Sequence, residues 1–564
     1  MESKKKLLAV DLFAGAGGLS HGFLQTGQVQ IIAAVENNTS AAKTYERNHP
    51  NVKLFGDIKS IDFNEIINEC KQLEKDGIDI VFGGPPCQGF SNANRQKTEL
   101  ISTNNNLVKE YVKAIEKLNP KAFVMENVKA MKSSKHKFFF SQVDKGEIVD
   151  DLELDLIDEK VVIGRECSLS KELVEFLNES FYIHGTKLKP YILIDKNIFS
   201  TIRHLSRKEK EFTIYLSRAK DALKKYFPSW GELHKEYWSD GYKEKWDLFG
   251  QLLAQDHLDD IEIVNFKNLL REVIEVQKIL MKMNEVQQNN IDIDGIFCER
   301  SNIYFKVRTY NVLEYLTAKF QKLGYRINKD KLILNAAEFG APQTRERLFI
   351  IGVKEDLIGS EEVLLPNPLI DNPKNFYKVK HAIQDLESIE PATSSDIDSI
   401  KRNIKHPSNP LLEYLFGGSD KIYNHVMTKS TQTALDRFIL LEPGQNFHNL
   451  DEKHKQTYSN PGRTQNSVYF RLDYEEPSGT VLNVRKSMWV HPSRDRAISI
   501  REAARLQTFP DNFVFEGSKD SQYQQIGNAV PPLLGRAVAE TVLKYLGRNI
   551  EEPLANLMKP IEII

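Results

Sequence analysis

The chain has few cysteines, and they lie far apart. Its 564 residues contain four of them, Cys70, Cys87, Cys167 and Cys298, and no Cys-x-x-Cys pair. Zinc sites and disulfide frameworks need clustered or regularly spaced cysteines, so this distribution argues against both and suits a reducing compartment. We therefore expect no metal.

Long apolar runs are also missing. No stretch approaches the roughly 20 apolar residues that a membrane helix requires. The lysines and the Leu7-Leu8-Ala9-Val10 run near the start resemble a signal peptide, but Asp11 interrupts the apolar run too early. With 41% apolar and 27% charged residues, the composition is that of an ordinary globular protein. These features predict a cytoplasmic protein with two or three domains.

The chain has no excess of positive charge, because its net charge is −2. Any affinity for nucleic acid must therefore come from a local basic surface. The segment from Arg203 to Lys225 is rich in lysine and arginine within a helical pattern. A solvated helix face is the ordinary interpretation of such a segment, and a phosphate-contacting surface is the alternative.

The glycine- and proline-rich stretch at residues 83–91 is the most informative part of the sequence. It reads Gly-Gly-Pro-Pro-Cys-Gln-Gly-Phe-Ser and follows Asp79-Ile80-Val81-Phe82, which predicts a short buried strand. The glycines and prolines end that strand in a rigid turn with Cys87 at its tip. Open α/β sheets bind ligands beyond the carboxyl ends of their strands. Cys87 is therefore a candidate nucleophile, although a lone cysteine is more often a small buried hydrophobe.

Three other strand ends predict a nucleoside pocket. The predicted strand from Leu7 to Phe13 leads into Ala14-Gly15-Ala16-Gly17-Gly18, whose glycines let the backbone approach a ligand at a helix N-terminus. The next two predicted strands end at Glu36 and at Gly56-Asp57-Ile58. An acid about 20 residues after such a turn commonly binds ribose hydroxyls. The turn lacks the Gly-x-Gly-x-x-Gly spacing, which disfavours a dinucleotide.

Charged residues occur at two further places where burial would be costly. The predicted strand from Ala122 to Met125 ends in Glu126, and a buried carboxylate must be paired or protonated. Arg345 and Arg347 alternate along an extended segment between two predicted strands, so we expect their side chains on one face. Both observations point to function rather than to structure alone.

These stretches, in this order, resemble the motifs of the DNA (cytosine-5-)-methyltransferase family of bacterial restriction–modification systems. The resemblance covers about residues 7–131 and 307–546. It rests on Asp11 to Gly18, Pro85 to Ser91, Glu126-Asn127-Val128, Gln343 to Arg347, Arg501 to Pro510 and Tyr523 to Pro532. It implies an α/β, Rossmann-like, S-adenosylmethionine-dependent methyltransferase catalytic domain with a smaller target-recognition domain.

The resemblance also implies a reaction and its residues. The enzyme would transfer a methyl group from S-adenosyl-L-methionine to C5 of a flipped-out cytosine in a specific double-stranded DNA sequence, through a covalent bond between Cys87 and C6. Glu126 would protonate the ring, Arg347 would lie near the pyrimidine oxygen, and Arg345 would favour the thiolate. The implied cofactor-binding residues are Phe13, Gly15, Ala16, Gly17, Glu36, Asp57, Ile58, Pro86, Leu107 and Asn528. A restriction endonuclease acting on the same site is the implied partner, and the enzyme would act as a monomer in the nucleoid.

The motif positions divide the chain into five segments. Residues 1–131, 307–353 and 492–564 would form the catalytic domain, whose last part closes on the first strand, and residues 354–491 would form the target-recognition domain. Residues 132–306 contain no family motif. Their helical periodicity predicts a largely helical insertion of unknown role, in which the acidic stretch from Glu147 to Gly164 could form strands.

Three alternatives stay open at this point. An RNA cytosine methyltransferase carries the same Pro-Pro-Cys-Gln motif, but the long segment 354–491 favours DNA. A catalytically inactive DNA-binding regulator is disfavoured because Cys87, Glu126, Arg345 and Arg347 are all present. A nicotinamide oxidoreductase is disfavoured by the glycine spacing.

Overall fold

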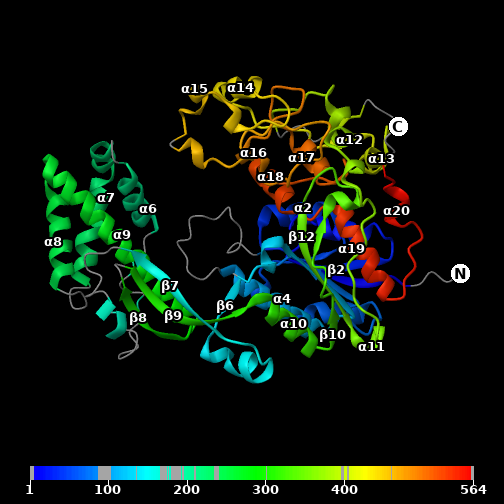
Figure 1. Ribbon diagram of the computed structural model, residues 1–564, viewed down its shortest axis with the longest axis horizontal. Coiled ribbons are helices and arrows are strands. Elements are labelled where there is room, and N and C mark those ends of the chain that lie inside the picture. Colours follow the sequence, from blue (N-terminus) through cyan, green and yellow to red (C-terminus); the bar gives the residue numbers. More distant parts are fainter. Residues whose placement is uncertain are drawn as a thin grey trace. The chain divides into compact units, whose positions relative to one another are not determined.

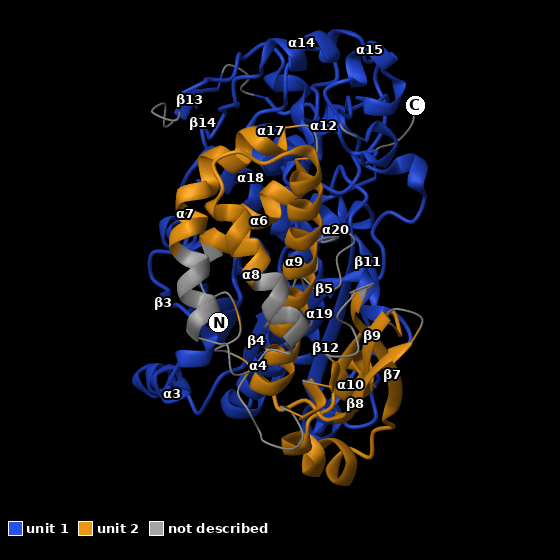
Figure 2. Ribbon diagram, turned by 90° about the vertical axis from the view of Figure 1, so that its left-hand side faces the viewer, with its two compact units in different colours: residues 1–87, 106–132, 319–564 blue, residues 88–105, 133–318 orange. Residues whose placement is uncertain are grey.

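The computed structural model of the chain describes residues 5–86, 103–134, 136–165, 174–175, 177–179, 188, 192, 196–208, 211–233, 240–299, 302–394, 399–402, 406–458 and 460–560. The chain forms two compact units, which Figure 1 shows with their elements and Figure 2 shows in two colours. Unit 1 comprises residues 1–87, 106–132 and 319–564, and unit 2 comprises residues 88–105 and 133–318.

Unit 1 is built on an eight-stranded sheet of order β10-β12-β5-β4-β1-β2-β3, with β11 paired to β12. Its strands are β1 (Leu7–Leu12), β2 (Val29–Val35), β3 (Lys53–Phe55), β4 (Ile80–Gly83), β5 (Ala122–Val128), β10 (Tyr325–Ile327), β11 (Ile333–Asn335) and β12 (Glu346–Lys354). Strands β1 to β5 are parallel to their neighbours, and β12 is antiparallel to β5. The order reverses between β1 and β4, and this switch point is where open α/β sheets bind ligands.

Burial on both faces explains the composition of the central strands. Every residue of β1 and β4 is buried, and the sequences Leu-Leu-Ala-Val-Asp-Leu and Ile-Val-Phe-Gly are almost continuously apolar. Strands covered by helices on both faces read as apolar runs rather than as alternating patterns. Residue 83 must be glycine, because a Cβ there would lie 1.9 Å from the backbone oxygen of Leu12.

The helices of unit 1 follow its strands and close the fold at the C-terminus. They include α1 (Gly18–Leu24), α2 (Thr39–Asn48), α3 (Phe63–Gln72), α4 (Thr103–Leu118), α10 (Val312–Lys322), α11 (Glu355–Ile358), α17 (Ile500–Leu506), α18 (Lys519–Asn528), α19 (Pro532–Tyr545) and α20 (Leu554–Leu557). Helix α10 crosses the division between the units.

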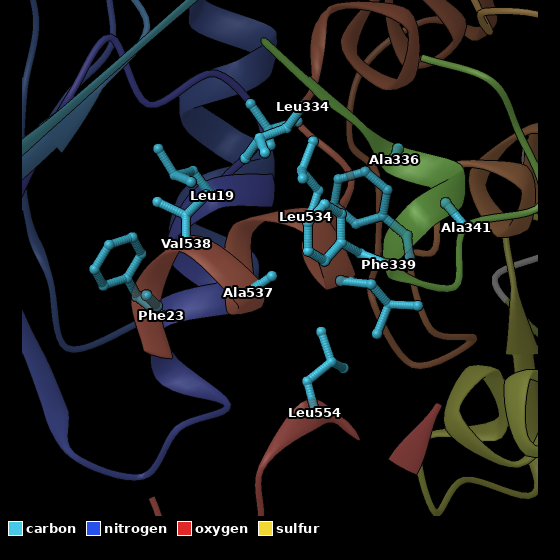
Figure 3. Packing of buried hydrophobic residues seen from close by; sticks show 14 of the residues in the cluster. Leu19, Phe23, Leu334, Ala336, Phe339, Ala341, Leu534, Ala537, Val538 and Leu554 are labelled. Carbon is cyan, nitrogen blue, oxygen red and sulfur yellow. The ribbon is translucent and has the colours of Figure 1, made fainter. Parts of the chain in front are cut away.

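The last long helix packs against the first. Leu19 and Phe23 of α1 lie against Ala537 and Val538 of α19 in the apolar core (Figure 3). The two helices approach closely, since a Cβ on Gly22 would lie 2.5 Å from a backbone nitrogen of α19. Beyond α19, Arg548 donates a hydrogen bond of 2.8 Å to the backbone oxygen of Lys5, immediately before β1.

Residues 355–499 of unit 1 contain short elements joined by long loops. These are α12 (Val379–Ile383), α13 (Pro410–Phe416), α14 (Gln432–Ile439), α15 (Glu452–Lys455), α16 (Val484–Ser487) and the antiparallel pair β13 (Ser399–Lys401) and β14 (Lys421–Tyr423). A small core of its own surrounds Phe438 and Phe447. Arg501 in α17 connects this segment to the chain that follows α17. Its buried guanidinium donates to the backbone oxygen of Tyr423 within the segment and to those of Pro510 and Phe513 beyond it.

Unit 2 has a core of its own, formed by a four-stranded antiparallel sheet and helices. Strand β9 (Asn302–Asn311) is central and pairs with β6 (Lys137–Phe139), β7 (Ile157–Arg165) and β8 (Ile293–Glu299). The helices are α6 (Lys196–Arg207), α7 (Phe212–Leu233), α8 (Asp240–Ala254) and α9 (Asp260–Gln288), and α9 begins with a capping box of Asp259 and Glu262. The insertion contains helices, as its periodicity predicts, but residues 197–226, whose pattern indicates one helical stretch, form the two helices α6 and α7. The possible strand in 147–164 corresponds to β7 alone, since residues 146–151 form a π-helical turn.

Candidate active site

The two loops beyond the carboxyl ends of β1 and β4 form the centre of the candidate site. Gly84, Pro85 and Pro86 follow β4 directly, and the predicted nucleophile Cys87 lies outside the described residues. The side chain of Asn127 donates a hydrogen bond of 3.0 Å to the backbone oxygen of Pro85. This bond ties the turn that leads to Cys87 to the end of β5, the strand that carries Glu126.

Glu126 and Arg347 form an ion pair at this edge of the sheet. Arg347 Nε lies 3.1 Å from Glu126 Oε1, and each side chain is 13% exposed. The pair arises from the register of β5 and β12, in which Arg347 lies opposite Val128 and Phe349 opposite Glu126. A Cβ on Gly84 would lie 2.6 Å from Glu126 Oε2, so glycine leaves room for the carboxylate beside the turn.

The carboxyl of Glu126 holds its proton more readily than an ordinary glutamate. Burial raises its pKa, and the positive charges of Arg347 and Arg345 offset only part of that rise. Burial likewise lowers the pKa of Arg347, against the opposing effect of Glu126. A carboxyl in such surroundings can act as a general acid toward a base bound next to it.

Arg345 is fully buried and holds two backbone segments. Its Nη1 donates to the oxygen of Val481 and its Nη2 to the oxygen of Gly527, each over 2.9 Å. Both arginines lower the pKa of Glu126, as expected if they share one side of the segment. Gln343, two residues earlier, accepts from the Val481 N–H and donates to the oxygen of Leu506. The segment 343–347 thus connects β12 to α17, to α18 and to the loop around residue 481.

The turn after β1 and the end of β2 are joined by Glu36. Its Oε2 accepts from the backbone N–H of Gly15 over 2.8 Å, and its Oε1 accepts from Asn38 over 2.6 Å. Phe13 begins the turn with a φ of 60°, a left-handed conformation that costs a residue with a side chain about 1–3 kcal/mol and is common at binding sites. Burial raises the pKa of Glu36, while the hydrogen bonds from Asn38 and Gly15 lower it.

The other predicted cofactor-binding residues differ in burial and in their position relative to this turn. Asp57 is exposed beyond β3, where its Oδ1 accepts from the Lys59 N–H, and Ile58 beside it is buried. Ala16 and Gly17 lie in the turn itself. The carboxyl end of β3 lies next to Glu36, whose N–H donates to the oxygen of Phe55 over 2.9 Å.

Three predicted positions have a weaker connection to the turn. Pro86 is half-buried at the end of the described segment 5–86, and Leu107 is half-buried in α4. Asn528 is exposed at the end of α18, and within the described residues no hydrogen bond joins its side chain to the turn. The chain nevertheless passes close by, since a Cβ on Gly18 would lie 2.4 Å from the backbone oxygen of Val530.

A buried hydrogen-bonded chain beneath the turn was not predicted. Ser20 Oγ donates to Asp11 Oδ2 over 2.5 Å and lies 2.8 Å from the hydroxyl of Tyr45. Burial raises the pKa of Asp11 well above its usual range. The sequence signal for this chain is Asp11 itself, because a carboxylate inside an apolar strand indicates a buried partner.

Among the described residues, no group of three or more histidine, cysteine, aspartate or glutamate side chains is arranged to hold a metal ion. In the same part of the chain, no helix is both long and apolar enough to span a bilayer.

The comparison with known families decides the class of enzyme. A family model described as C-5 cytosine-specific DNA methylase matches residues 7–147 and 296–544. The chain belongs to this family. The expected enzyme class, DNA (cytosine-5-)-methyltransferase, is therefore confirmed. Residues 148–295, between the matched segments, all lie in unit 2.

Individual relatives match nearly the whole chain. The type II methyltransferase M.DdeI of Desulfomicrobium norvegicum is 25% identical over 551 residues, covering 95% of this chain and 88% of that protein. The DNA (cytosine-5-)-methyltransferase M.ApeKI of Aeropyrum pernix is 24% identical over 562 residues, covering 95% and 98%.

A solved structure supports the fold. The structure of a DNA modification methyltransferase encoded within a prophage (E. coli) has a TM-score of 0.51 at 19% identity and covers 96% of this chain and 100% of that one. The expected fold class, a Rossmann-like methyltransferase, is confirmed by this likeness together with the family.

Proposed function

We propose that the protein transfers a methyl group from S-adenosyl-L-methionine to C5 of a flipped-out cytosine in a specific duplex DNA sequence. The observation that carries the proposal is the Glu126–Arg347 pair, which lies beside the Gly84 turn that leads to Cys87. A carboxyl whose pKa is raised by burial and a guanidinium 3.1 Å away match the ring nitrogen and the oxygen of a cytosine. The modification role in a restriction–modification system is proposed from the type II relatives.

The residues at the carboxyl ends of β1, β2 and β3 fit S-adenosylmethionine. Glu36 and Asp57 supply two carboxylates beside a half-buried turn, as a cofactor with a positive sulfonium and two ribose hydroxyls requires. There is space at the ends of β1 and β3, because a Cβ on Gly15 in the turn or on Gly56 after β3 would meet no atom within 4 Å. When bound, the cofactor supplies an electrophilic methyl group. Glu36 would accept from the ribose, Asp57 from the adenine amino group, and Phe13 would contact the adenine ring.

The chain's own residues would activate the cytosine. The Cys87 thiolate attacks C6, forming an Sγ–C6 bond, and the displaced electron pair moves through the ring toward N3. Glu126 gives its proton to N3, and Arg347 stabilises the charge that develops on O2. C5 thereby becomes nucleophilic. C5 would then take up the methyl group. When C5 loses its proton to water, the electron pair of the C5–H bond re-forms the C5=C6 double bond, the Sγ–C6 bond breaks and Cys87 leaves as the thiolate, while the proton on N3 returns to Glu126. The base must leave the duplex because C6 is inaccessible in the stack.

Arg345 acts in this scheme chiefly by holding the site together. Its hydrogen bonds to Val481 and Gly527 fix the chain on two sides of the catalytic strands. Its buried charge would still favour the thiolate of Cys87. We propose that residues 354–491 recognise the target sequence, since Arg463 and Lys486 of helix α16 supply positive charge there.

Methylation mapping tests the proposed function. Genomic DNA from cells that express the protein, sequenced after bisulfite treatment, should show 5-methylcytosine at one short recurrent sequence. Total RNA from the same cells serves as the control substrate. Methylation confined to RNA, or absent from both, would contradict the proposal.

Cofactor affinity tests the pocket separately. Glu36→Gln and Asp57→Asn should each weaken S-adenosylmethionine binding by about 1–3 kcal/mol, the value of a hydrogen bond to a charged group. Glu46→Gln, an exposed position on α2, is the matched control and should bind as the wild type does. Isothermal titration calorimetry measures all three. Wild-type affinity in both pocket variants would remove these residues from the site.

A further inference from the structure

Helices α6 and α7 of unit 2 are rich in basic residues. Residues 196–225 contain nine lysine and arginine residues and three acidic residues, in a chain whose net charge is −2. Seven apolar residues of the two helices lie in the core of unit 2, although Ile214 of α7 is exposed; they are Ile198, Phe199, Ile202, Leu205, Phe212, Leu216 and Leu223. The charges therefore lie on the outer faces.

Part of this charge has partners inside unit 2. Lys220 donates to the backbone oxygen of Gln255, and Lys224 lies 4.0 Å from Asp256. For these lysines, a local structural role is a sufficient explanation.

A second group has no such partner. Arg207, Arg218 and Lys225 are exposed, and no ion pair joins them to a carboxylate among the described residues. Together with Tyr215 and with Lys208, whose ammonium lies 3.9 Å from a carboxylate oxygen of Glu211, they define what we call the α6–α7 basic surface. On α7, Tyr215, Arg218 and Lys225 follow a spacing of three and seven residues, which puts them on one helix face.

Two cationic side chains pack against the aromatic ring of Tyr215. The Lys208 ammonium lies 4.8 Å and the Arg218 guanidinium 5.6 Å from the centre of its ring, and the His204 ring packs edge-on at 5.1 Å. Cation–π contacts of this kind restrict long side chains before they bind. Less conformational entropy is then lost when the cations meet an anion.

The helix dipole accounts for only part of this surface. Arg207 and Lys208 lie at the C-terminus of α6, where positive charge is stabilising. Arg218 and Lys225 lie in the interior of α7, where no such effect operates. For the charge there, a solvated helix face is the ordinary explanation, and a phosphate-binding surface is the alternative that the cation–π contacts with Tyr215 favour.

We propose that the α6–α7 basic surface binds the phosphate backbone of duplex DNA without reading its sequence. The interval from Tyr215 to Lys225 is about 15 Å long at about 1.5 Å per residue, and a duplex presents roughly nine phosphate charges over that length. Because unit 2 is covalently joined to unit 1, such contacts raise the overall affinity for DNA through effective concentration. The inference rests on DNA being the substrate of the enzyme.

A salt titration of the full-length protein tests the surface. The test variant carries Arg207→Gln, Arg218→Gln and Lys225→Gln. A charge-conserving variant carries Arg207→Lys, Arg218→Lys and Lys225→Arg. A control variant loses three exposed charges of unit 1, through Lys43→Gln, Lys71→Gln and Lys117→Gln. Fluorescence anisotropy measures binding to cognate and scrambled duplexes, without cofactor, from about 50 to 200 mM salt.

The slope of log affinity against log salt decides the outcome. Each lost phosphate contact lowers the slope by roughly 0.9, so the test variant should lose up to roughly 2.7, equally on both duplexes. The other two variants should keep the wild-type slope. The proposal is overturned by an unchanged slope in the test variant, by a loss confined to the cognate duplex, or by an equal loss in either control. Failure of the proposed function would instead appear as a wild-type enzyme that methylates no DNA.

Discussion

Cys87→Ser is expected to abolish methyl transfer while DNA and cofactor binding persist. The thiolate forms the bond to C6, and a serine hydroxyl is far too weak a nucleophile without a neighbouring base. Loss of a covalent nucleophile lowers kcat by a factor on the order of 10⁴–10⁶. Incorporation of labelled methyl groups into duplex DNA measures the rate. Cys298→Ser, an exposed cysteine in β8, is the matched control and should retain activity.

A trapped intermediate makes this prediction specific. A duplex with 5-fluorocytosine at the target position should form an adduct with the wild type that survives denaturation, because fluorine at C5 cannot leave as a proton does. Cys87→Ser should form none. An adduct on the serine variant, or an adduct whose peptide maps to another cysteine, would show that Cys87 is not the nucleophile.

The sequence was most informative where local patterns determine structure. Strands β1, β2 and β4 are short, largely apolar runs bounded by turn residues, and the glycine turn after β1 contains its own conformational signal. Both could be predicted from a few neighbouring residues. The sheet of unit 2 was predicted only in part. In β9, Phe305 and Val307 are buried and alternate with Lys306, which is exposed, and Arg308, which is half-buried. That period-two pattern is a strand signal.

Other features depend on contacts between residues that lie far apart in the sequence and meet only in the folded chain. Arg345 holds backbone oxygens 136 and 182 residues away, and nothing near it in the sequence indicates which ones. The Asp11–Ser20–Tyr45 chain likewise forms only because α1 and α2 bring their hydroxyls to the end of β1. The family resemblance supplied Glu126 and Arg347 as site residues, and the register of β5 and β12 explains why they meet. The five-segment division of the chain and the recognition role of residues 354–491 stay predictions.

Glu126→Gln is expected to reduce kcat by a factor on the order of 10²–10⁴, the usual contribution of a general acid. The amide can still donate a hydrogen bond to the ring, but it cannot give up a proton to N3. The pH profile should change as well. In the wild type, the rate should fall as pH rises through the pKa of Glu126, which burial raises. Glutamine does not titrate, so this descending limb should be absent from the variant.

Substitution of Arg347 tests whether the descending limb of the pH profile follows the pKa of Glu126. The charge of Arg347 lowers the pKa of Glu126, so Arg347→Gln should raise that pKa and move the descending limb to higher pH, in addition to lowering kcat. The matched control is Lys129→Gln, which removes the 2.6 Å ion pair with Glu346 near the same strand. Both of those side chains are largely exposed, so solvent screens their charges and the limb should stay in place. Single-turnover rates across pH measure all variants. A descending limb that persists in Glu126→Gln, or that moves to lower pH in Arg347→Gln, would show that another group titrates and that Glu126 is not the acid.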